Sequence, residues 1–376
     1  MTTSTLAGRD GRRYPLDEPR WRGDDGSPLM VSPQPGLTRA DVDSSVRSQW
    51  RYAAALPIRP APVSLGEGCT PLLDVRLSGV PLAVKPEWFN PTASFKDRGT
   101  SVMVSVLAHQ GIGAILEDSS GNGGASVAAY AAAAGIRATI LAPESTSAAK
   151  TLQSRVHGAE VELVPGPRQA TADEAVRRSS GVFYASHNWH PFFLQGTKLI
   201  AYEIWEDLGF RAPDAVLLPL GAGSLVLGCA IGFAELLRSG AIERPPRLLA
   251  VQPENCAPLA RAFAAGAPAV SPAEWTPTAA EGTSIARPVR DREVLDAVRS
   301  CGGEIAAVPE DAIAPAVREL AAQGLFAEPT SALVAAAVPG FAARGAISAS
   351  DTVVAVLSGS GLKVPQTLSR ILGEPM

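Results

Sequence analysis

At the centre of this sequence stands the stretch Pro91-Thr92-Ala93-Ser94-Phe95-Lys96-Asp97-Arg98-Gly99-Thr100, and an apolar-rich helical segment follows it at residues 101–107. Ser94 is the expected N-cap of that helix, because its hydroxyl can accept a hydrogen bond from a free amide of the first turn. Lys96 would then lie at a helix start, where the helix dipole disfavours a cation and lowers the pKa of the amine. Because only a neutral amine attacks an aldehyde, the stretch predicts a lysine that forms a Schiff base. The alternative is a surface lysine beside two charged neighbours, Asp97 and Arg98.

The composition favours a large two-domain protein that acts on small molecules. Its 376 residues suit two domains that share a cleft, and 46% hydrophobic against 19% charged residues allow a large core. The net charge of −4, with no basic run, disfavours nucleic acid as a partner. No apolar run of about 18 residues, long enough to span a membrane, is present. The four cysteines show neither metal-ligand nor disulfide spacing, which favours a reducing, cytoplasmic location.

Beyond an irregular start, the chain alternates strands with helices. Residues 1–50 are rich in Arg, Asp, Pro and Gly and predict an arm laid over the body, or partial disorder. Buried strands are expected at 81–85, 113–118, 138–143, 161–164, 215–220, 248–251 and 352–357. Helices are expected at 125–134, 148–157, 171–179, 196–208, from the glycine turn to 237, within 258–278, and at 291–299, 310–323 and 332–344. This alternation predicts an α/β fold with two open, doubly wound, mostly parallel sheets, in which ligands bind beyond the carboxyl ends of the strands.

One of these strand ends carries a short glycine loop, Gly221-Ala222-Gly223-Ser224-Leu225. Glycines permit the turn, successive amides converge, and the helix start adds partial positive charge, so the loop suits a phosphate group. It is not a dinucleotide fingerprint, because the sixth position of that pattern is Val226. The alternative is a tight turn between a strand and a helix.

Two further strand ends are rich in Gly and Ser. Ser119-Ser120-Gly121-Asn122-Gly123-Gly124 offers hydroxyls, an amide side chain and free backbone amides, which suit a carboxylate and a ring oxygen; the alternative is a capped turn. Ser358 ends the last buried strand, and its neutral hydroxyl could hydrogen-bond an aromatic nitrogen, although a serine that caps a turn is the commoner case. A metal site is not expected, because His187 and His190 are the only close pair of histidines and no cysteine accompanies them. A serine hydrolase is disfavoured by the lack of a G-x-S-x-G segment.

Taken in order along residues 63–370, the motifs carry a family resemblance. They are Glu67-Gly68-Cys69-Thr70-Pro71-Leu72, the lysine stretch, Ser120 to Gly124, Gly221 to Ser224, Glu328-Pro329-Thr330-Ser331-Ala332, and Ser358-Gly359-Ser360-Gly361-Leu362-Lys363. This set resembles the pyridoxal-phosphate enzymes of the tryptophan-synthase-β fold, fold type II, and within them it is most similar to threonine synthase. The resemblance implies a pyridoxal 5'-phosphate cofactor, a small amino-acid substrate and a homodimer.

The resemblance also implies a role for each candidate residue. Lys96 would form the Schiff base and move protons at Cα and Cβ, and Ser358 would face the pyridine nitrogen. Asn122 would contact the ring hydroxyl, and Ser119, Ser120 and Gly123 would face the substrate carboxylate. The cofactor phosphate would lie on the loop formed by Gly221, Ala222, Gly223, Ser224 and Leu225. The implied domains are an N-terminal arm (1–62), a large cofactor-binding domain (63–100 and 206–376) and a smaller α/β domain (101–205).

Some segments depart from the family pattern. The lead segment around 14–29 has no paired cysteines, so no zinc ribbon is expected, and Ser360 stands where threonine synthases often have His. Where many carry an Asn-Pro-His-Arg-like segment that helps to hold the substrate phosphate, this chain reads His190-Pro191-Phe192-Phe193. Phenylalanine cannot pair with phosphate, and Lys198, Arg155 and His187 are the candidates to compensate.

Three hypotheses about function follow. The first is a lyase that converts O-phospho-L-homoserine and water to L-threonine and phosphate. The second is a β-eliminase or β-replacement enzyme, such as a serine/threonine dehydratase or a specialised amino-acid synthase, and the aromatic segment 190–193 favours it modestly. The third is a non-catalytic ligand-sensing relative, which the presence of Lys96, Asn122 and Ser358 disfavours.

Overall fold

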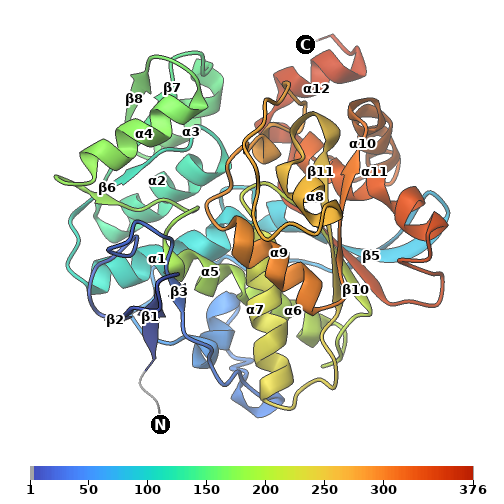
Figure 1. Ribbon diagram of the computed structural model, residues 1–376, viewed down its shortest axis with the longest axis horizontal. Coiled ribbons are helices and arrows are strands. Elements are labelled where there is room, and N and C mark those ends of the chain that lie inside the picture. The colour runs from blue at the N-terminus through green and yellow to red at the C-terminus, as the bar shows by residue number, and fades with distance from the viewer. Residues whose placement is uncertain (1–3, 376) are drawn as a thin grey trace.

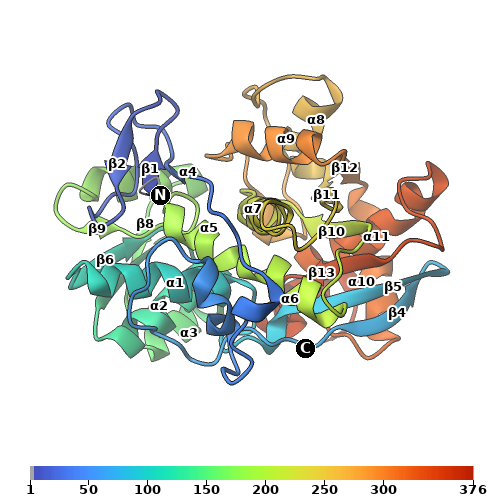
Figure 2. The same cartoon turned by 90° about the horizontal axis from the view of Figure 1, so that it is seen from below.

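The computed structural model describes residues 4–375. Its two main sheets consist mostly of parallel strands and lie on opposite sides of the molecule (Figures 1 and 2). The larger sheet has six strands in the order β12-β11-β10-β13-β5-β4, of which only the β4–β5 pair is antiparallel. Its strands are β4 (Leu73–Leu77), β5 (Val80–Pro86), β10 (Ala215–Pro219), β11 (Arg247–Pro253), β12 (Glu304–Val308) and β13 (Val353–Leu357). The smaller sheet has four parallel strands in the order β8-β7-β6-β9. They are β6 (Ala114–Glu117), β7 (Arg137–Pro143), β8 (Glu160–Val164) and β9 (Phe183–Tyr184). The predicted fold class is therefore confirmed.

Strands buried on both faces divide their side chains between two cores. Along β13, Val354 and Val356 enter one apolar cluster, whereas Val353, Ala355 and Leu357 enter another. This alternation follows from the two-residue period of a strand. It explains why the central strands are continuous apolar runs, as expected for a parallel sheet that helices cover on both faces.

Helices cover both faces of each sheet (Figure 1). The helices packed on the larger sheet are α7 (Ser224–Arg238), α8 (Pro258–Ala264), α9 (Asp291–Ser300) and α11 (Pro329–Ala343), with α6 (Leu199–Asp207) against α7 and α10 (Ile313–Ala321) against α11. Those packed on the smaller sheet are α2 (Asn122–Ala134), α3 (Ala148–Val156) and α4 (Arg168–Arg178). Helix α1 (Lys96–His109) packs against α2 and α5 (Pro191–Thr197), and α12 (Pro365–Leu372) lies near the C-terminus.

The N-terminal segment is ordered over the described residues, so the expectation of partial disorder is wrong there. Strands β1 (Thr5–Ala7), β2 (Arg13–Pro15) and β3 (Met30–Val31) form a small antiparallel sheet. Its apolar side chains pack with Val106 of α1 and Phe192 of α5. Very short strands carry too little periodicity to be recognised in a sequence.

Other differences from the predicted elements are local. The expected helix at 196–208 is two helices, α5 and α6, which meet at Lys198. Strands β9 and β12 and helix α12 were not predicted. Over residues 4–375, no helix combines the length and the hydrophobicity needed to cross a membrane.

Candidate active site

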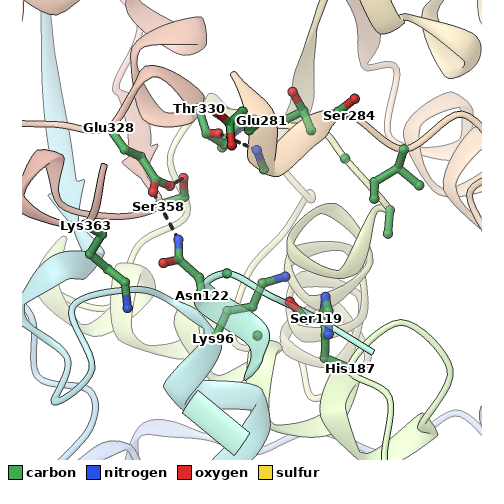
Figure 3. Close-up of a pocket in the computed structure, with 18 of the residues that line it drawn as sticks. Lys96, Ser119, Asn122, His187, Glu281, Ser284, Glu328, Thr330, Ser358 and Lys363 are labelled. Atoms are coloured by element: carbon green, nitrogen blue, oxygen red, sulfur yellow. Dashed lines mark hydrogen bonds between the residues drawn. The ribbon is translucent and has the colours of Figure 1, made fainter. Parts of the chain in front are cut away.

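A cavity of about 380 Å³ is lined by the loops at the carboxyl ends of strands from both sheets. Every predicted site residue lines this cavity, from the smaller sheet's loop, the larger sheet's loops and the start of α1. These residues are Lys96, Ser119, Ser120, Asn122, Gly123, Gly221, Ala222, Gly223, Ser224, Leu225 and Ser358. The fold thus brings together motifs that lie far apart in sequence, and Figure 3 shows several of them around one space.

Lys96 is the first residue of α1, and its amine lies 4.5 Å from the centroid of the Phe95 ring and 5.7 Å from that of Phe193. Burial lowers the pKa of the Lys96 amine to about 8, although Glu117 and Glu328 oppose the shift. The surface-lysine alternative is wrong, because Lys96 is only partly exposed and lines the cavity, and the neighbouring Asp97 and Arg98 are fully buried.

The predicted N-cap is also wrong. The cap position is Phe95, whose backbone is already helical, and no side chain there accepts a hydrogen bond. Ser94 is instead held in an antiparallel bridge with Gly359, and its buried hydroxyl has no hydrogen-bond partner among the described residues. Tertiary pairing with the larger sheet's last loop therefore overrides the local capping preference.

The glycine loop after β10 has the geometry of an anion cradle. Gly223 has φ of +95°, a conformation that side chains rarely adopt, and α7 begins at the next residue, Ser224. A Cβ atom on Gly223 would meet Val294 Cγ2 at 2.3 Å, and one on Gly221 would meet the carbonyl oxygen of Gly282 at 2.9 Å. Glycine at both positions therefore permits this tight turn, which brings the backbone amides of the helix start to the cavity.

The loop after β6 approaches the cavity equally closely. Helix α2 begins at Asn122, three residues earlier than predicted, so that Asn122 and Gly123 lie in its first turn. A Cβ on Gly123 would meet the His187 ring at 2.7 Å and Ser119 Oγ at 2.9 Å. The glycine therefore allows an imidazole and a hydroxyl to lie against the helix start.

Glu328 forms hydrogen bonds with two residues predicted to bind the cofactor, Asn122 and Ser358, although the sequence assigned Glu328 itself no role. Its carboxylate accepts hydrogen bonds from Asn122 Nδ2 at 3.0 Å and from Ser358 Oγ at 3.0 Å (Figure 3). Burial raises the pKa of Glu328, while these two donors oppose that shift. Ser331 supports Ser358 from the other side, with the two hydroxyl oxygens 3.1 Å apart. In the sequence, Glu328 stood out only as the first residue of the family motif Glu328 to Ala332.

His187 and Glu117 form a second polar contact at the cavity. His187 Nδ1 lies 3.0 Å from Glu117 Oε1, and the backbone amide of His187 donates to Glu117 Oε2 at 3.0 Å. Burial, with the nearby Lys96, lowers the pKa of the His187 imidazole well below its usual value. Burial also raises the pKa of the Glu117 carboxyl well above its usual value.

Of the cations proposed to replace the missing arginine, only His187 lines the cavity. Lys198 is fully buried and pairs with Glu235 at 2.8 Å, and Arg155 donates to a backbone carbonyl of β8. Arg168, at the start of α4, does line the cavity and was missed. Lys150 and Lys363 line it as well; Lys150 pairs with Glu281, and Lys363 donates to Gln153 at 2.7 Å.

The aromatic segment that replaces the arginine belongs to the core. His190 caps α5 by accepting a hydrogen bond from the amide of Phe192, and Phe193 is fully buried against Gly99. The His187 ring packs edge-on against Phe193 at 5.7 Å. Within residues 4–375, no group of three or more metal-ligating side chains is present, and all four cysteines are unpaired.

The site lies at the carboxyl ends of parallel strands and combines three features. They are a lysine of lowered pKa, a glycine cradle for an anion, and a buried carboxylate that accepts hydrogen bonds from polar side chains. Together they define an α/β enzyme that holds an anionic aldehyde cofactor. The chain belongs to the family described as "Pyridoxal-phosphate dependent enzyme", which matches residues 63–359. This membership favours an enzyme over the ligand-sensing alternative.

Comparison with individual proteins shows which enzymes of this family the chain is similar to. Threonine synthase of Methanosarcina acetivorans is 35% identical over 336 residues, which cover 87% of this chain and 83% of the relative. Threonine synthase of Methanocaldococcus jannaschii is 34% identical over 337 residues, with 87% and 83% covered. Among solved structures, a threonine deaminase from T.th. has a TM-score of 0.64 at 29% identity, covering 77% of this chain and 92% of that one. A fungal L-serine ammonia-lyase from Rhizomucor miehei has a TM-score of 0.70 at 21% identity, covering 82% and 99%, which shows the shared fold.

Proposed function

We propose that this protein is a threonine synthase-like lyase that converts O-phospho-L-homoserine and water to L-threonine and phosphate. The observation that carries the proposal is the single cavity in which Lys96, the glycine cradle and the serine loop meet. The threonine synthase relatives, which match most of the chain, support the choice of substrate. Purified enzyme given O-phospho-L-homoserine is expected to release threonine and phosphate in equal amounts.

The polar groups that line the cavity fit pyridoxal phosphate. The amides of Gly221 to Leu225 would hold the phosphate, in a turn whose close contacts leave no room for a side chain on Gly221 or Gly223. Asn122 would contact the ring hydroxyl, and Ser358 would face the ring nitrogen, both oriented by Glu328. When bound, pyridoxal phosphate supplies the electron sink that makes the hydrogens at Cα and Cβ of an amino acid acidic.

The protein's own part is to bind, orient and move protons. Ser119, Ser120 and Gly123 would bind the substrate carboxylate at the start of α2, where the helix dipole favours an anion. The Lys96 amine would take and return the proton at Cα and at Cβ, and its lowered pKa keeps a useful fraction of it neutral near pH 8.

Substitution of Gly223 by alanine tests the cradle. An alanine with positive φ costs about 1–3 kcal/mol, and its Cβ would displace Val294, so we expect the affinity for pyridoxal phosphate to fall at least about tenfold. Gly240 is the matched control, because it follows the other end of α7, has φ of +74° and has open space at its Cβ. Equal affinities of Gly223→Ala and Gly240→Ala, by equilibrium titration, would contradict the assignment.

The second candidate is a β-eliminase or β-replacement enzyme acting on a substrate without a γ-phosphate. It is favoured by Phe193, which is buried in the core where an arginine would reach the phosphate. The similarity to a threonine deaminase structure points the same way. L-Serine or L-threonine would then give an oxo acid and ammonia, and O-phospho-L-homoserine would release no phosphate.

Arg168 supports the first candidate over the second. Its Nη2 donates to Asp118 at 2.7 Å, whereas its Nη1 is buried without a hydrogen-bond partner among the described residues. Asp118 is held on its other side by Tyr184 Oη at 2.7 Å. The Arg168 side chain as a whole is 37% exposed, lines the cavity and is held there by Asp118, a position that suits the distal anion of a substrate.

We therefore expect Arg168→Gln to raise KM for O-phospho-L-homoserine about 10- to 100-fold, because a charge-assisted hydrogen bond contributes about 1.5–3 kcal/mol. KM for L-serine, as an alternative substrate, should change little. Arg177→Gln is the control, since Arg177 lies on the same helix and is 70% exposed. An equal change for both substrates would show that Arg168 has no role in reading the phosphate.

We also propose domain boundaries, an oligomeric state and a cellular location. The strands of the larger sheet support a large domain at 63–100 and 206–376, those of the smaller sheet support one at 101–205, and the small antiparallel sheet supports an N-terminal arm at 1–62. We propose a homodimer on the family resemblance. We also propose a cytoplasmic location, which the four unpaired cysteines favour.

A further inference from the structure

The Glu117–His187 pair is a proton-binding unit that the proposed function does not yet use. Glu117 is the last residue of β6 and is fully buried, and His187 follows β9, the neighbouring parallel strand. Two backbone amides, those of His187 and Asp118, donate to the Glu117 carboxylate at 3.0 and 3.2 Å. The carboxylate is therefore fixed, and it fixes the imidazole through the 3.0 Å contact to Nδ1.

This contact determines which imidazole nitrogen is available. The two amide donors favour an ionised Glu117, and to an ionised carboxylate the imidazole can only donate Nδ1–H, which leaves the lone pair on Nε2. Nε2 has no hydrogen-bond partner among the described residues. His187 lines the cavity, and Figure 3 shows its ring beside Ser119 and facing the same space as the Lys96 amine. Gly123, which leaves no room for a side chain, lets the ring lie against the start of α2.

Because Glu117 and His187 are both buried, the two side chains accept one proton jointly. A lone carboxylate is costly in a buried site, as is a lone imidazolium, which is why the pKa of Glu117 is raised and that of His187 is lowered. When a proton binds at Nε2, the Nδ1 proton can pass to Glu117, and the pair becomes neutral in both members. Uptake of one proton therefore removes a buried charge instead of creating one.

The groups around the imidazole are consistent with this role. The charged groups that face it are Lys96 from α1, Glu117 and Asp118 from the end of β6, and Arg168 from α4. From α5 the apolar ring of Phe193 packs edge-on against it.

We propose that His187 is a second catalytic acid–base residue, positioned by Glu117, that serves the oxygen bonded or released at Cβ of the amino acid. This inference rests on the proposed function. In water addition, a lone pair of the water oxygen forms the bond to Cβ, the O–H bond breaks and leaves its electrons on that oxygen, and the proton bonds to Nε2. The electron pair of the Cα–Cβ double bond moves towards Cα, where the electron sink that pyridoxal phosphate would supply can accept it. In the alternative function the same proton moves in reverse, from Nε2 to a departing hydroxyl.

Activity measurements separate this role from a structural one. We expect His187→Asn to lower kcat for threonine formation about 10²- to 10⁴-fold with little change in KM. Exchange of the α-hydrogen of L-2-aminobutyrate, which is threonine without its Cβ hydroxyl, should continue in D₂O, because it needs only Lys96. His109→Asn, at an exposed position on α1, is the control and should retain both activities. Parallel losses of threonine formation and α-hydrogen exchange in His187→Asn would overturn the proposal.

A second variant and a second readout address the pair itself. In the wild type, the rate of threonine formation should fall at acid pH as the Glu117–His187 pair takes up its proton. In Glu117→Gln this acid limb of the pH–rate profile should move to lower pH, because the buried carboxylate no longer raises the proton affinity of His187. NMR of ¹⁵N-histidine-labelled enzyme at pH 7 should show a neutral His187 ring protonated at Nδ1. A ring protonated at Nε2, or an unchanged acid limb in Glu117→Gln, would overturn the role of the pair. A wild-type enzyme without lyase activity would contradict the proposed function, whereas the NMR readout does not depend on turnover.

Discussion

Replacement of Lys96 by alanine is expected to lower kcat/KM by more than about 10⁴-fold, because the variant loses both the proton-transfer group and the covalent attachment of the cofactor. Borohydride treatment of the wild type should leave the cofactor on the peptide that contains Lys96. The amine's pKa of about 8, lowered by burial, also predicts that the rate at which apoenzyme takes up pyridoxal phosphate rises with pH through about 8. The sign follows because only the neutral amine reacts, and the neutral fraction grows as pH increases.

Lys96→Arg is the matched variant, because it keeps the positive charge but cannot supply a neutral amine. We expect it to be as inactive as Lys96→Ala. Turnover in either variant, or borohydride labelling at another lysine, would show that the wrong residue has been assigned.

Replacement of Arg98 by methionine is expected to lower the free energy of unfolding by about 3–5 kcal/mol, because it leaves buried carboxylates without their partner. Arg98 is fully buried and donates to Glu87 and Glu203, each at 2.8 Å. Glu87 follows β5 of the larger sheet and Glu203 lies in α6, so the guanidinium joins both to the helix that carries Lys96. Urea denaturation of the two proteins measures the difference.

The control is Arg177→Met, since Arg177 is 70% exposed and pairs with Glu174 on its own helix; its effect should stay within about 0.5 kcal/mol. The pKa of Glu203 is lowered, chiefly by Arg98, against the opposing effect of burial. Its contribution to stability is therefore full above the unfolded pKa, about 4.3, and declines as pH falls towards the folded value. A difference between wild type and Arg98→Met that is as small as the control's would contradict the structural role of Arg98.

The architecture was predictable because its strands are unusually clear. Runs such as 215–220 and 353–357 are buried on both faces, so they are continuously apolar, and Gly or Ser follows each. Strand β9 has two residues, and three of the five residues of β12 are alanine or glutamate, so neither gave a comparable signal. Lys198, at which α5 meets α6, makes a buried contact with Glu235, and no local pattern encodes such a contact.

The same distinction holds for the site. Backbone features such as the glycine cradle are local, and the sequence predicted all of those residues. Contacts between side chains are not local: Asn122 meets Glu328 across 206 positions, and His187 meets Glu117 across 70. Arg168 was missed for the same reason, because its role depends on Asp118 from a different loop.

The most direct test of the proposed function is turnover of O-phospho-L-homoserine in H₂¹⁸O, with both products examined by mass spectrometry. Elimination at the γ-carbon followed by water addition at Cβ predicts threonine that carries one ¹⁸O and an equal amount of phosphate that carries none. Homoserine together with ¹⁸O-labelled phosphate would reveal hydrolysis of the phosphate ester, and an absence of threonine would likewise contradict the account.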